Sequence, residues 1–127
     1  MLRIKQILKE NYYGGLFYVL NGTVKDLTID GATVTCFRGA ALIGRLDAGL
    51  VENCHVKNAR IYSEQKAGGL AGYVNNSSQD LIIRGCSASD ITLDKLSSMD
   101  EAYMMGGFIG YLQSYERNTL IENNSVS

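Results

Sequence analysis

The chain has 127 residues, 46% of them hydrophobic, and a formal net charge of −1. This length and composition suit one compact domain with a substantial core. No run of lysine or arginine is present, so nucleic acids and anionic membrane surfaces are not favoured as partners. No apolar stretch approaches the roughly 18 to 20 residues that insertion into a bilayer requires.

Residues 1–13 are predicted to form a short N-terminal cap. Ile4, Ile7, Leu8 and Asn11 follow a helical spacing, so we expect this segment to be helical and to cover the first strands with its apolar side. Its charges are scattered instead of preceding an apolar block, which is not the pattern of a signal peptide. Since the chain also stops at NNSVS without a closing element, we expect it to be a segment of a longer exported protein.

From residue 14 onward the sequence predicts β-strands almost throughout. Val, Ile, Thr, Leu and Tyr alternate with polar residues in short runs that end at Gly, Asn or Asp. Proline is absent, which suits a sheet in which nearly every backbone N–H donates to a neighbouring strand. The sequence therefore predicts an all-β domain.

The strand pattern is repeated along the chain. Three copies, TVKDLTIDGATV, LVENCHVKNARI and IIRGCSASDITL, are followed by a shorter one, LIENNSVS, and the repeats cover about 14–39, 40–67, 68–105 and 106–127. Superposing the copies gives columns of apolar residues that we expect to form the core. These columns are Leu16, Leu42, Leu70 and Phe108; Val24, Val51, Ile83 and Ile121; Ile29, Val56, Ala88 and Val126; Ala32, Ala59 and Ile91; and Val34, Ile61 and Leu93.

The alternation of apolar and polar residues is interrupted at two places in each copy, and we expect the chain to bend at each of them. The first set of bend residues is Asp26, Asn53, Gly85 and Asn123, and the second is Gly31, Asn58 and Asp90. These residue types tolerate a left-handed backbone. Three short strands per copy then stack in parallel on the next copy, about 4.8 Å away. The predicted fold is a right-handed parallel β-helix of about four coils, its hand following the preference of parallel crossovers.

A phrase framed by glycines also recurs, as GLAG at 69–72, GFIG at 107–110, ALIG at 41–44 and GLFY at 15–18. With the pair Asn53–Cys54 and its looser versions Gly85–Cys86 and Asn123–Asn124, residues 14–127 resemble the GLUG repeat of bacterial surface proteins and of the immunoglobulin A peptidase family. The resemblance implies a β-solenoid of a secreted or cell-surface bacterial protein. It supplies no active site.

The final glycines of these phrases, Gly44, Gly72 and Gly110, are expected on the interior side of their strand, where a missing side chain lets the opposite wall approach closely. A phosphate-binding loop is the rival interpretation. Such a loop needs a helix N-terminus after it, and here another strand follows. We therefore expect these positions to be glycine because another part of the chain packs closely against them.

The cysteines and the histidine do not suggest a catalytic or metal site. Three cysteines leave one unpaired in any disulfide scheme, and Cys54 and Cys86 share an interior column, so we expect them to behave as small buried residues. Alternation points His55 to the opposite face from Cys54. A zinc site, a Cys–His nucleophile and a bound cofactor are accordingly not expected.

An outward column of alternating charge contains Lys25, Glu52, Arg84 and Glu122, and we expect a ladder of exposed ion pairs that fixes the order of stacking. The alternative is a carbohydrate-active enzyme of the polysaccharide lyase or hydrolase type, because β-helix enzymes of that kind gather Asp, Glu, Arg or Lys in a groove on one wall. Carboxylates that converge in a groove would favour the enzyme, and a flat wall would favour a display module.

The outward column beside the glycines contains Arg45, Tyr73 and Tyr111. Exposed aromatic rings beside a guanidinium can stack on a sugar or on a protein side chain, so these residues are the candidate ligand-facing surface. The simpler interpretation is that the tyrosines only cover the sheet. The combined prediction is a non-catalytic structural or adhesion module that binds a glycan or a host protein.

Two further expectations concern the third copy and the last one. The segment DKLSSMDEAYMM lengthens the third copy, so we expect it to be an insertion outside the coils. The last copy stops in mid-coil and leaves Ile121 and Val126 with partners on one side only. The chain is therefore expected to form a homodimer through its uncapped C-terminal coil or to fray there.

Overall fold

The computed structural model of the chain describes residues 2–3, 7–8, 13–76, 80–95, 104–114 and 119–127. All the regular structure in these ranges is β-strand, and every strand pair is parallel. The predicted all-β class is confirmed. The described part of the chain contains no helix with the length and apolar character needed to cross a membrane.

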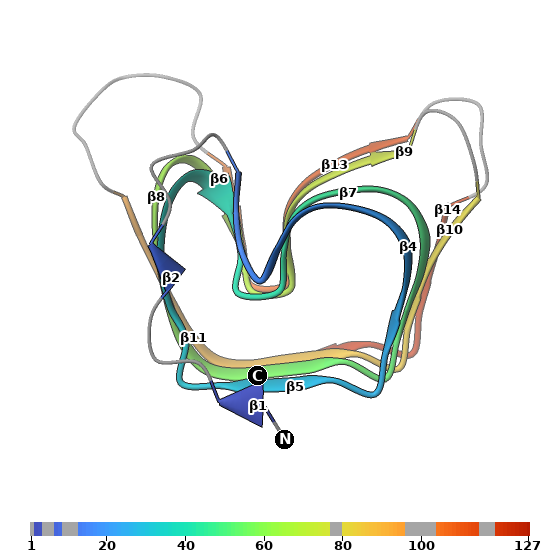
Figure 1. Ribbon diagram of the computed structural model, residues 1–127, viewed down its shortest axis with the longest axis horizontal. Helices are drawn as coiled ribbons and strands as arrows, with labels where there is room; N and C mark the ends of the chain where they lie inside the picture. The colour runs from blue at the N-terminus through green and yellow to red at the C-terminus, as the bar shows by residue number, and fades with distance from the viewer. Residues whose placement is uncertain (1, 4–6, 9–12, 77–79, 96–103, 115–118) are drawn as a thin grey trace.

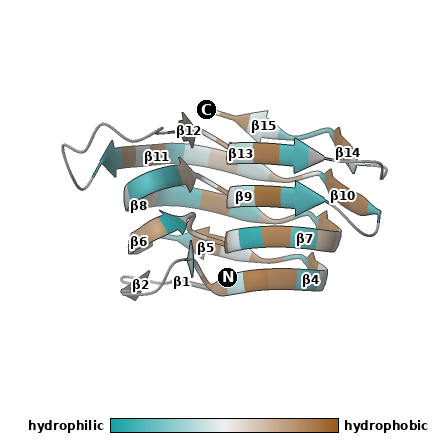
Figure 2. Ribbon diagram, turned by 90° about the horizontal axis from the view of Figure 1, so that it is seen from above, coloured by the Kyte–Doolittle hydropathy of each residue, from teal (hydrophilic) through white to brown (hydrophobic). Residues whose placement is uncertain are grey.

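Each repeat copy winds once around the molecule, and we call this circuit a pass. Figure 1 shows the passes lying over one another along a common outline that has one deep indentation. Figure 2 shows the same passes from the side, with β4, β7, β9 and β13 as successive levels. Consecutive copies of the sequence repeat are therefore neighbours in space.

The larger sheet has nine strands and forms the lower and left walls in Figure 1. Its main path is β1 (Leu2–Arg3), β5 (Thr28–Asp30), β8 (His55–Gly68), β11 (Ser87–Lys95) and β15 (Ser125–Val126). The remaining strands are β2 (Ile7–Leu8) and β3 (Tyr13–Gly14), which pair with β6 (Thr33–Gly39), and β12 (Met104–Gly106), which pairs with β8 as β6 does.

The smaller sheet has six strands and forms the right side of the outline. Its path is β13 (Ile109–Ser114), β9 (Ala71–Asn76), β7 (Ile43–Glu52), β10 (Leu81–Arg84) and β14 (Thr119–Glu122), and β4 (Phe17–Lys25) pairs with β7. In the second pass β7 and β8 are long strands, so the bend at Asn58 lies inside β8 instead of between two strands.

The strand register confirms pairs in four of the five predicted apolar columns, all but the column of Leu16, Leu42, Leu70 and Phe108. Val51 is paired with Val24 on one side and Ile83 on the other, and Ile83 is paired with Ile121. The other columns follow from the pairs Ile29–Val56, Val56–Ala88, Ala88–Val126, Ala59–Ile91, Val34–Ile61 and Ile61–Leu93. The middle passes supply the buried core, which includes Leu42, Leu70, Val51 and Ile83 at 0 to 1% exposure.

The predicted bends are also confirmed. All seven bend residues have positive φ, with angles of 58° at Asp26, 52° at Asn53, 64° at Gly85, 53° at Asn123, 88° at Gly31, 55° at Asn58 and 54° at Asp90. Side chains at the bends join neighbouring passes, because Asn53 Nδ2 donates to Asp26 Oδ1 at 2.7 Å and Asn58 Nδ2 donates to Asp30 Oδ1 at 3.0 Å. The repeat thus encodes both the turning of the chain and the stacking of its passes.

Glycines line the indentation, where two arms of the chain meet. A Cβ added to Gly72 would lie 2.7 Å from the Cα of Gly39, and one added to Gly110 would lie 2.6 Å from the carbonyl oxygen of Ala67. These distances leave no room for a side chain, so the predicted close approach is confirmed. The wall that approaches is the adjacent arm of the indentation, at the ends of β6 and β8, and not the far side of the core.

The predicted N-terminal helix is wrong at the residues that the structure describes. Leu2 and Arg3 pair with Ile29 and Asp30, and Ile7 and Leu8 pair with Val34 and Thr35, all as parallel strands. The strands β5 and β6 of the first pass have an edge that offers backbone hydrogen bonds to the N-terminal segment. Pairing with this edge outweighs the weak helical spacing of the apolar residues in that segment. Residues 1, 4–6 and 9–12 of the predicted N-terminal segment lie outside the described residues.

The insertion in the third pass is shorter than predicted. Asp94 and Lys95 belong to β11 and pair with Tyr62 and Ser63, whereas Met104 and Met105 belong to β12 and pair with Lys66 and Ala67. The interval between these pairs is residues 64–65 on β8 and residues 96–103 in the third pass, and the latter lie outside the described residues. Eight residues of the third pass therefore stand against two of the second, a difference of six, and a further four are added between Val74 and Leu81, where six residues stand against two between Leu46 and Gly49.

Candidate functional site

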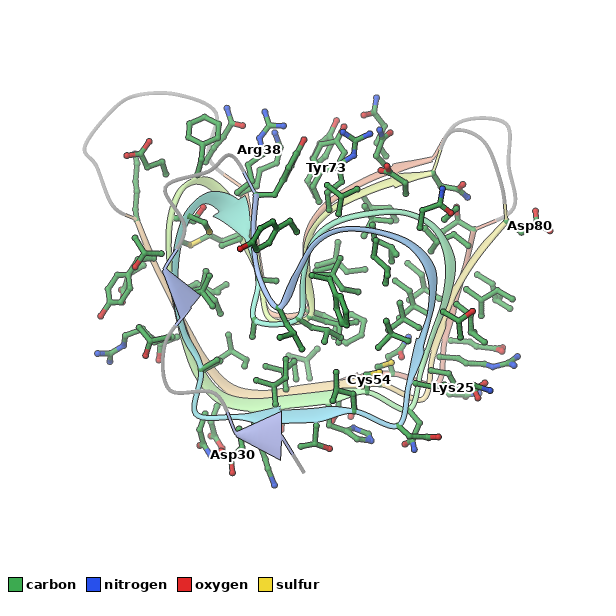
Figure 3. All side chains as sticks on the ribbon, viewed as in Figure 1. Lys25, Asp30, Arg38, Cys54, Tyr73 and Asp80 are labelled. Carbon is green, nitrogen blue, oxygen red and sulfur yellow. The ribbon has the colours of Figure 1, made fainter. Side chains whose placement is uncertain are left out.

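Two columns of side chains face each other at the mouth of the indentation. Arg45 on β7, Tyr73 on β9 and Tyr111 on β13 are in register on one arm, as the sequence predicted. Arg38 on β6 and Lys66 on β8 are in register on the other arm. Figure 3 shows Arg38 and Tyr73 at this opening. We call the set Arg38, Arg45, Lys66, Tyr73 and Tyr111 the tyrosine–cation cluster.

The two tyrosines form a short aromatic ladder. Their ring centroids are 5.2 Å apart and their planes are inclined by 37°, within the range of favourable aromatic pairs. The hydroxyl of Tyr73 donates to Gln113 Oε1 at 2.6 Å, which fixes the orientation of that ring from the next pass. Both rings are half-buried, so the ladder keeps part of its surface open to solvent.

Cations from the facing arm lie over the ladder. The guanidinium carbon of Arg38 is 5.6 Å from the centroid of the Tyr73 ring. Lys66 Nζ is 5.5 Å from the centroid of Tyr73 and 4.9 Å from that of Tyr111. These are cation–π distances, so the two arms are held together at the surface by aromatic rings on one side and positive charges on the other.

Lys66 is buried, with only 8% of its surface exposed, although it carries a charge. Its ammonium donates to Gln65 Oε1 at 3.2 Å, and the same oxygen accepts a hydrogen bond from Arg38 Nε. Burial, and after it the nearby charge of Arg38, lower the pKa of Lys66. Among the described residues no carboxylate lies within ion-pair distance of Lys66.

Arg45 shares the column of the tyrosines, but its charged group has other partners. Its Nε is 2.6 Å from Asp47 Oδ1, and its guanidinium lies 5.8 Å from the centroid of the Tyr13 ring. The hydrogen bond that the Arg45 guanidinium donates to Asp47 raises the pKa of Arg45. Arg45 therefore extends the positive edge of the cluster without stacking on the ladder.

Sequence reasoning missed Arg38 and Lys66. Both stand four positions before an apolar anchor of the repeat, Leu42 in one copy and Leu70 in the next, so their shared column could have been read from the same superposition. Their position opposite the tyrosines could not have been predicted in this way, because the sequence repeat does not show where the outline of a pass folds inward. The glycines of that phrase were the available signal of a close approach.

The cysteines occupy a structural position at a bend. Cys86 Sγ lies 3.4 Å from the backbone nitrogen of Cys54 and 3.6 Å from the carbonyl oxygen of Val51. Asn124 contacts the bend below it in the same way, since its Oδ1 accepts from the Cys86 N–H at 2.9 Å and its Nδ2 donates to the Ile83 carbonyl at 3.1 Å. A residue at this position in one pass thus satisfies backbone groups of the preceding pass.

All three cysteines are free and buried, as predicted for Cys54 and Cys86. The hydrogen bond to Cys54, together with burial, raises the pKa of Cys86. His55 is the first residue of β8 and is half-buried. Its Nδ1 is 2.7 Å from Ser87 Oγ, and its Nε2 is 2.9 Å from Asn53 Oδ1. The described residues contain no group of three or more His, Cys, Asp or Glu side chains placed to hold a metal ion.

The predicted ion-pair ladder is formed only in part. Arg84 Nε lies 2.6 Å from Glu52 Oε2, whereas Lys25 and Glu122 occupy the column in register without an ion pair among the described residues. The carboxylates at the bends, Asp26 and Asp30, accept from asparagines of the next pass. These carboxylates are engaged in joining passes.

No family model, no curated protein and no solved structure matches this chain.

Proposed function

We propose that this chain is a right-handed parallel β-helix of the GLUG-repeat type and serves as a non-catalytic structural or adhesion module of a bacterial cell-surface or secreted protein. Parallel registers between successive passes and a repeated left-handed bend support the β-helix. The hand follows the general preference of parallel crossovers. The cellular location rests on the resemblance of the glycine-framed phrases.

The ligand-binding surface of this module is the tyrosine–cation cluster, and its ligand is an acidic glycan. The observation that carries this proposal is the combination of a half-buried tyrosine ladder with two cations, Arg38 and Lys66, that lie over its rings. The apolar face of a sugar ring packs against the edge of an aromatic ladder, and a carboxylate or sulfate group pairs with lysine and arginine.

The test compares binding of acidic and neutral oligosaccharides to the protein and to two variants. Tyr111→Ala should weaken binding of acidic glycans at least tenfold, because a stacked aromatic contact beside a charge contributes about 1.4 kcal/mol or more. Tyr62→Ala is the matched control, since Tyr62 lies half-buried on the outer face of β8, with its hydroxyl 3.5 Å from Arg60, and is not part of the cluster.

Three results would contradict the proposal. They are equal binding of neutral and acidic glycans, loss of binding in Tyr62→Ala alone, and binding of host matrix proteins in the absence of any glycan. Release of shortened oligosaccharide products during the same experiment would instead support the carbohydrate-active alternative.

The module also associates with a second copy through its last pass. Ile121 is 37% exposed and Val126 is 55% exposed, although both belong to columns that are buried in the middle passes. Apolar residues of this kind favour a partner that covers them.

A further inference from the structure

The thiols of Cys54 and Cys86 lie over one another in two neighbouring passes. The last pair between β7 and β10 and the first pair between β8 and β11 flank them with the same offset along the chain, so the two cysteines are in register. Both residues are buried, with 0% and 2% of their surface exposed. Figure 3 shows Cys54 at the corner between the lower and right walls. Two nucleophilic side chains are therefore buried together at one bend.

The separation of the two residues suits a disulfide bond. Residues in register on neighbouring parallel strands are about 4.8 Å apart, and the Cα atoms of disulfide-bonded cysteines are roughly 4.4 to 6.8 Å apart. The two side chains are already hydrogen-bonded to each other. Cys86 Sγ also lies 3.4 Å from the backbone nitrogen of Cys54, so it is turned toward the pass that holds its partner. A bond between the two sulfurs thus requires side-chain rotation but no separation of the passes.

The third cysteine has no part in this arrangement. Cys36 lies on β6 in register with Ser63 of β8, and its thiol donates to the carbonyl oxygen of Tyr62 at 3.8 Å. Its neighbour in the next pass is therefore a hydroxyl group and not a thiol. An odd number of cysteines leaves one of them unpaired in any disulfide scheme, and Cys36 is the one that the fold sets apart.

The hydrogen bond between the two thiols makes them unequal. It lowers the pKa of Cys54, although burial acts in the opposite direction, and together with burial it raises the pKa of Cys86. Cys54 is therefore the thiol that ionises first, while Cys86 donates the hydrogen bond. Since the thiolate is the nucleophile in disulfide exchange, we expect Cys54 to react first with an oxidant.

We propose that Cys54 and Cys86 form a covalent cross-linking site, which closes to a disulfide between the second and third passes when the protein reacts with a low-molecular-weight disulfide. The thiolate of Cys54 attacks one sulfur of this oxidant and releases the other sulfur as a thiol. Cys86, once deprotonated, attacks the Cys54 sulfur of the mixed disulfide and releases the second thiol. The protein loses two electrons and two protons, and the oxidant gains them as two thiol groups. This inference does not depend on the proposed glycan.

The cross-link should stabilise the two passes that it joins. Because both thiols are buried, the exchange takes place during folding or in molecules whose bend has opened locally. The bond joins residues 32 positions apart in the chain and so limits the freedom of the unfolded state. It also removes the weak contact of the Cys86 thiol with the Val51 carbonyl oxygen at 3.6 Å, which offsets part of the gain.

Glutathione disulfide is the probe, applied both to the folded protein and to protein that is refolding from urea. The product should be a single chain lighter by two hydrogen atoms, with one of its three thiols open to maleimide after denaturation. Peptide mapping should place the bond between Cys54 and Cys86. The midpoint of thermal unfolding should rise by about 5 °C or more, and dithiothreitol should reverse the rise.

Serine variants separate the roles of the three thiols. Cys36→Ser should still form the cross-link and is the matched control. Cys54→Ser and Cys86→Ser should each abolish it, and glutathione should attach faster to Cys86→Ser, which keeps the thiol that ionises first. Thermal unfolding of each reduced variant shows whether it is folded. The mass and the thiol count of the original protein do not depend on any variant.

Several outcomes would overturn the proposal. Three free thiols in the original protein after both treatments would do so, and so would a bond that includes Cys36 or a bond between two chains. An oxidised protein that unfolds at the same temperature as the reduced one, or at a lower one, would show that the passes do not accommodate the bond. Faster attachment of glutathione to Cys54→Ser than to Cys86→Ser would contradict the order of attack. Cross-linked chains with a raised midpoint would support the proposal.

Discussion

At the scale of single residues, the chain turns where a side chain accepts a left-handed backbone. This conformation costs most residues with a Cβ about 1 to 2 kcal/mol, and Asn and Asp tolerate it better than others because their short polar side chains bond locally. Among the described residues, the five non-glycine residues with positive φ are all Asn or Asp. The bends therefore limit residue choice more strongly than the exposed strand positions do.

Asp90 allows a direct test of this limit, because it is exposed and its φ is 54°. Asp90→Val should lower the free energy of unfolding by about 1 to 2 kcal/mol, since a β-branched residue is strained in this conformation. Asp90→Gly should be neutral or slightly stabilising. Urea denaturation of both variants provides the measurement, and an equal effect of Val and Gly would show that the backbone conformation is not limiting.

The core columns predict a second pair of outcomes. Leu70 is fully buried in the third pass, and Leu70→Ala should cost about 2 to 5 kcal/mol of unfolding free energy through lost burial and a cavity. Leu112 is 47% exposed in the last pass, so Leu112→Ala should change stability by about 0.5 kcal/mol or less in the monomer. A denaturation midpoint unmoved by Leu70→Ala would refute the assigned register.

Cys36 predicts a dependence of stability on pH. Burial raises the pKa of this thiol from 9.0 to about 12, and only 3% of the residue is exposed. Below pH 9 the thiol is neutral in both states, so it adds no pH dependence. Between pH 9 and about 12 the unfolded chain loses the proton while the folded chain keeps it, so stability falls by about 1.4 kcal/mol per pH unit.

The measurement for Cys36 is the denaturation midpoint between pH 8 and pH 11, compared with that of Cys36→Ala. The variant is less stable at every pH because of its cavity, but it should lack the thiol's share of the decline. Ionisation of the tyrosines is common to both proteins and cancels in the difference. Parallel curves would mean that Cys36 ionises in the folded state.

At the scale of elements, the indentation is the feature that gives the site its shape. Glycines let the ends of β6 and β8 approach the starts of β9 and β13, and this approach places Arg38 and Lys66 against Tyr73 and Tyr111. The backbone contact and the surface cluster are therefore parts of one arrangement. A change at the glycines should alter both stability and ligand binding.

Gly72→Ala tests that connection. Its Cβ would lie 2.7 Å from Gly39 backbone atoms, which cannot move as a flexible side chain could, so we expect a loss of about 1 to 3 kcal/mol and a weakened cluster. Gly22→Ala is the matched control, because nothing lies within 4 Å of the added Cβ and alanine is favoured over glycine in a strand. Tolerance of Gly72→Ala in thermal unfolding would contradict the close approach.

Elements repeated in the sequence could be predicted, and elements formed once could not. The columns through Val51 and Val56 followed from superposing copies, because each copy repeats the same burial pattern. The N-terminal strands at Leu2 and Ile7 did not, since their partners are supplied by the open edge of the first pass. Two of the five cluster residues, Arg38 and Lys66, were missed for a similar reason, because the place where a pass folds inward leaves no periodic signal in the sequence.

At the scale of the whole molecule, stability is distributed over contacts between neighbouring passes. The middle passes have partners on both sides and contain the buried core, whereas the first and last passes keep apolar residues exposed. In such an architecture a pass with a neighbour on one side only is expected to be less stable than a pass between two others. The end passes and the tyrosine–cation cluster are separate parts of the molecule.

The central claim is that successive repeats stack in parallel and in register. Nuclear Overhauser contacts between backbone protons of neighbouring strands test this claim most directly in solution. The account predicts contacts that join Val51 to Val24 and Ile83, and Val56 to Ile29 and Ala88, with the neighbouring pairs following in the same order along both strands. Contacts that run in opposite order, or that are shifted by one residue, would contradict it.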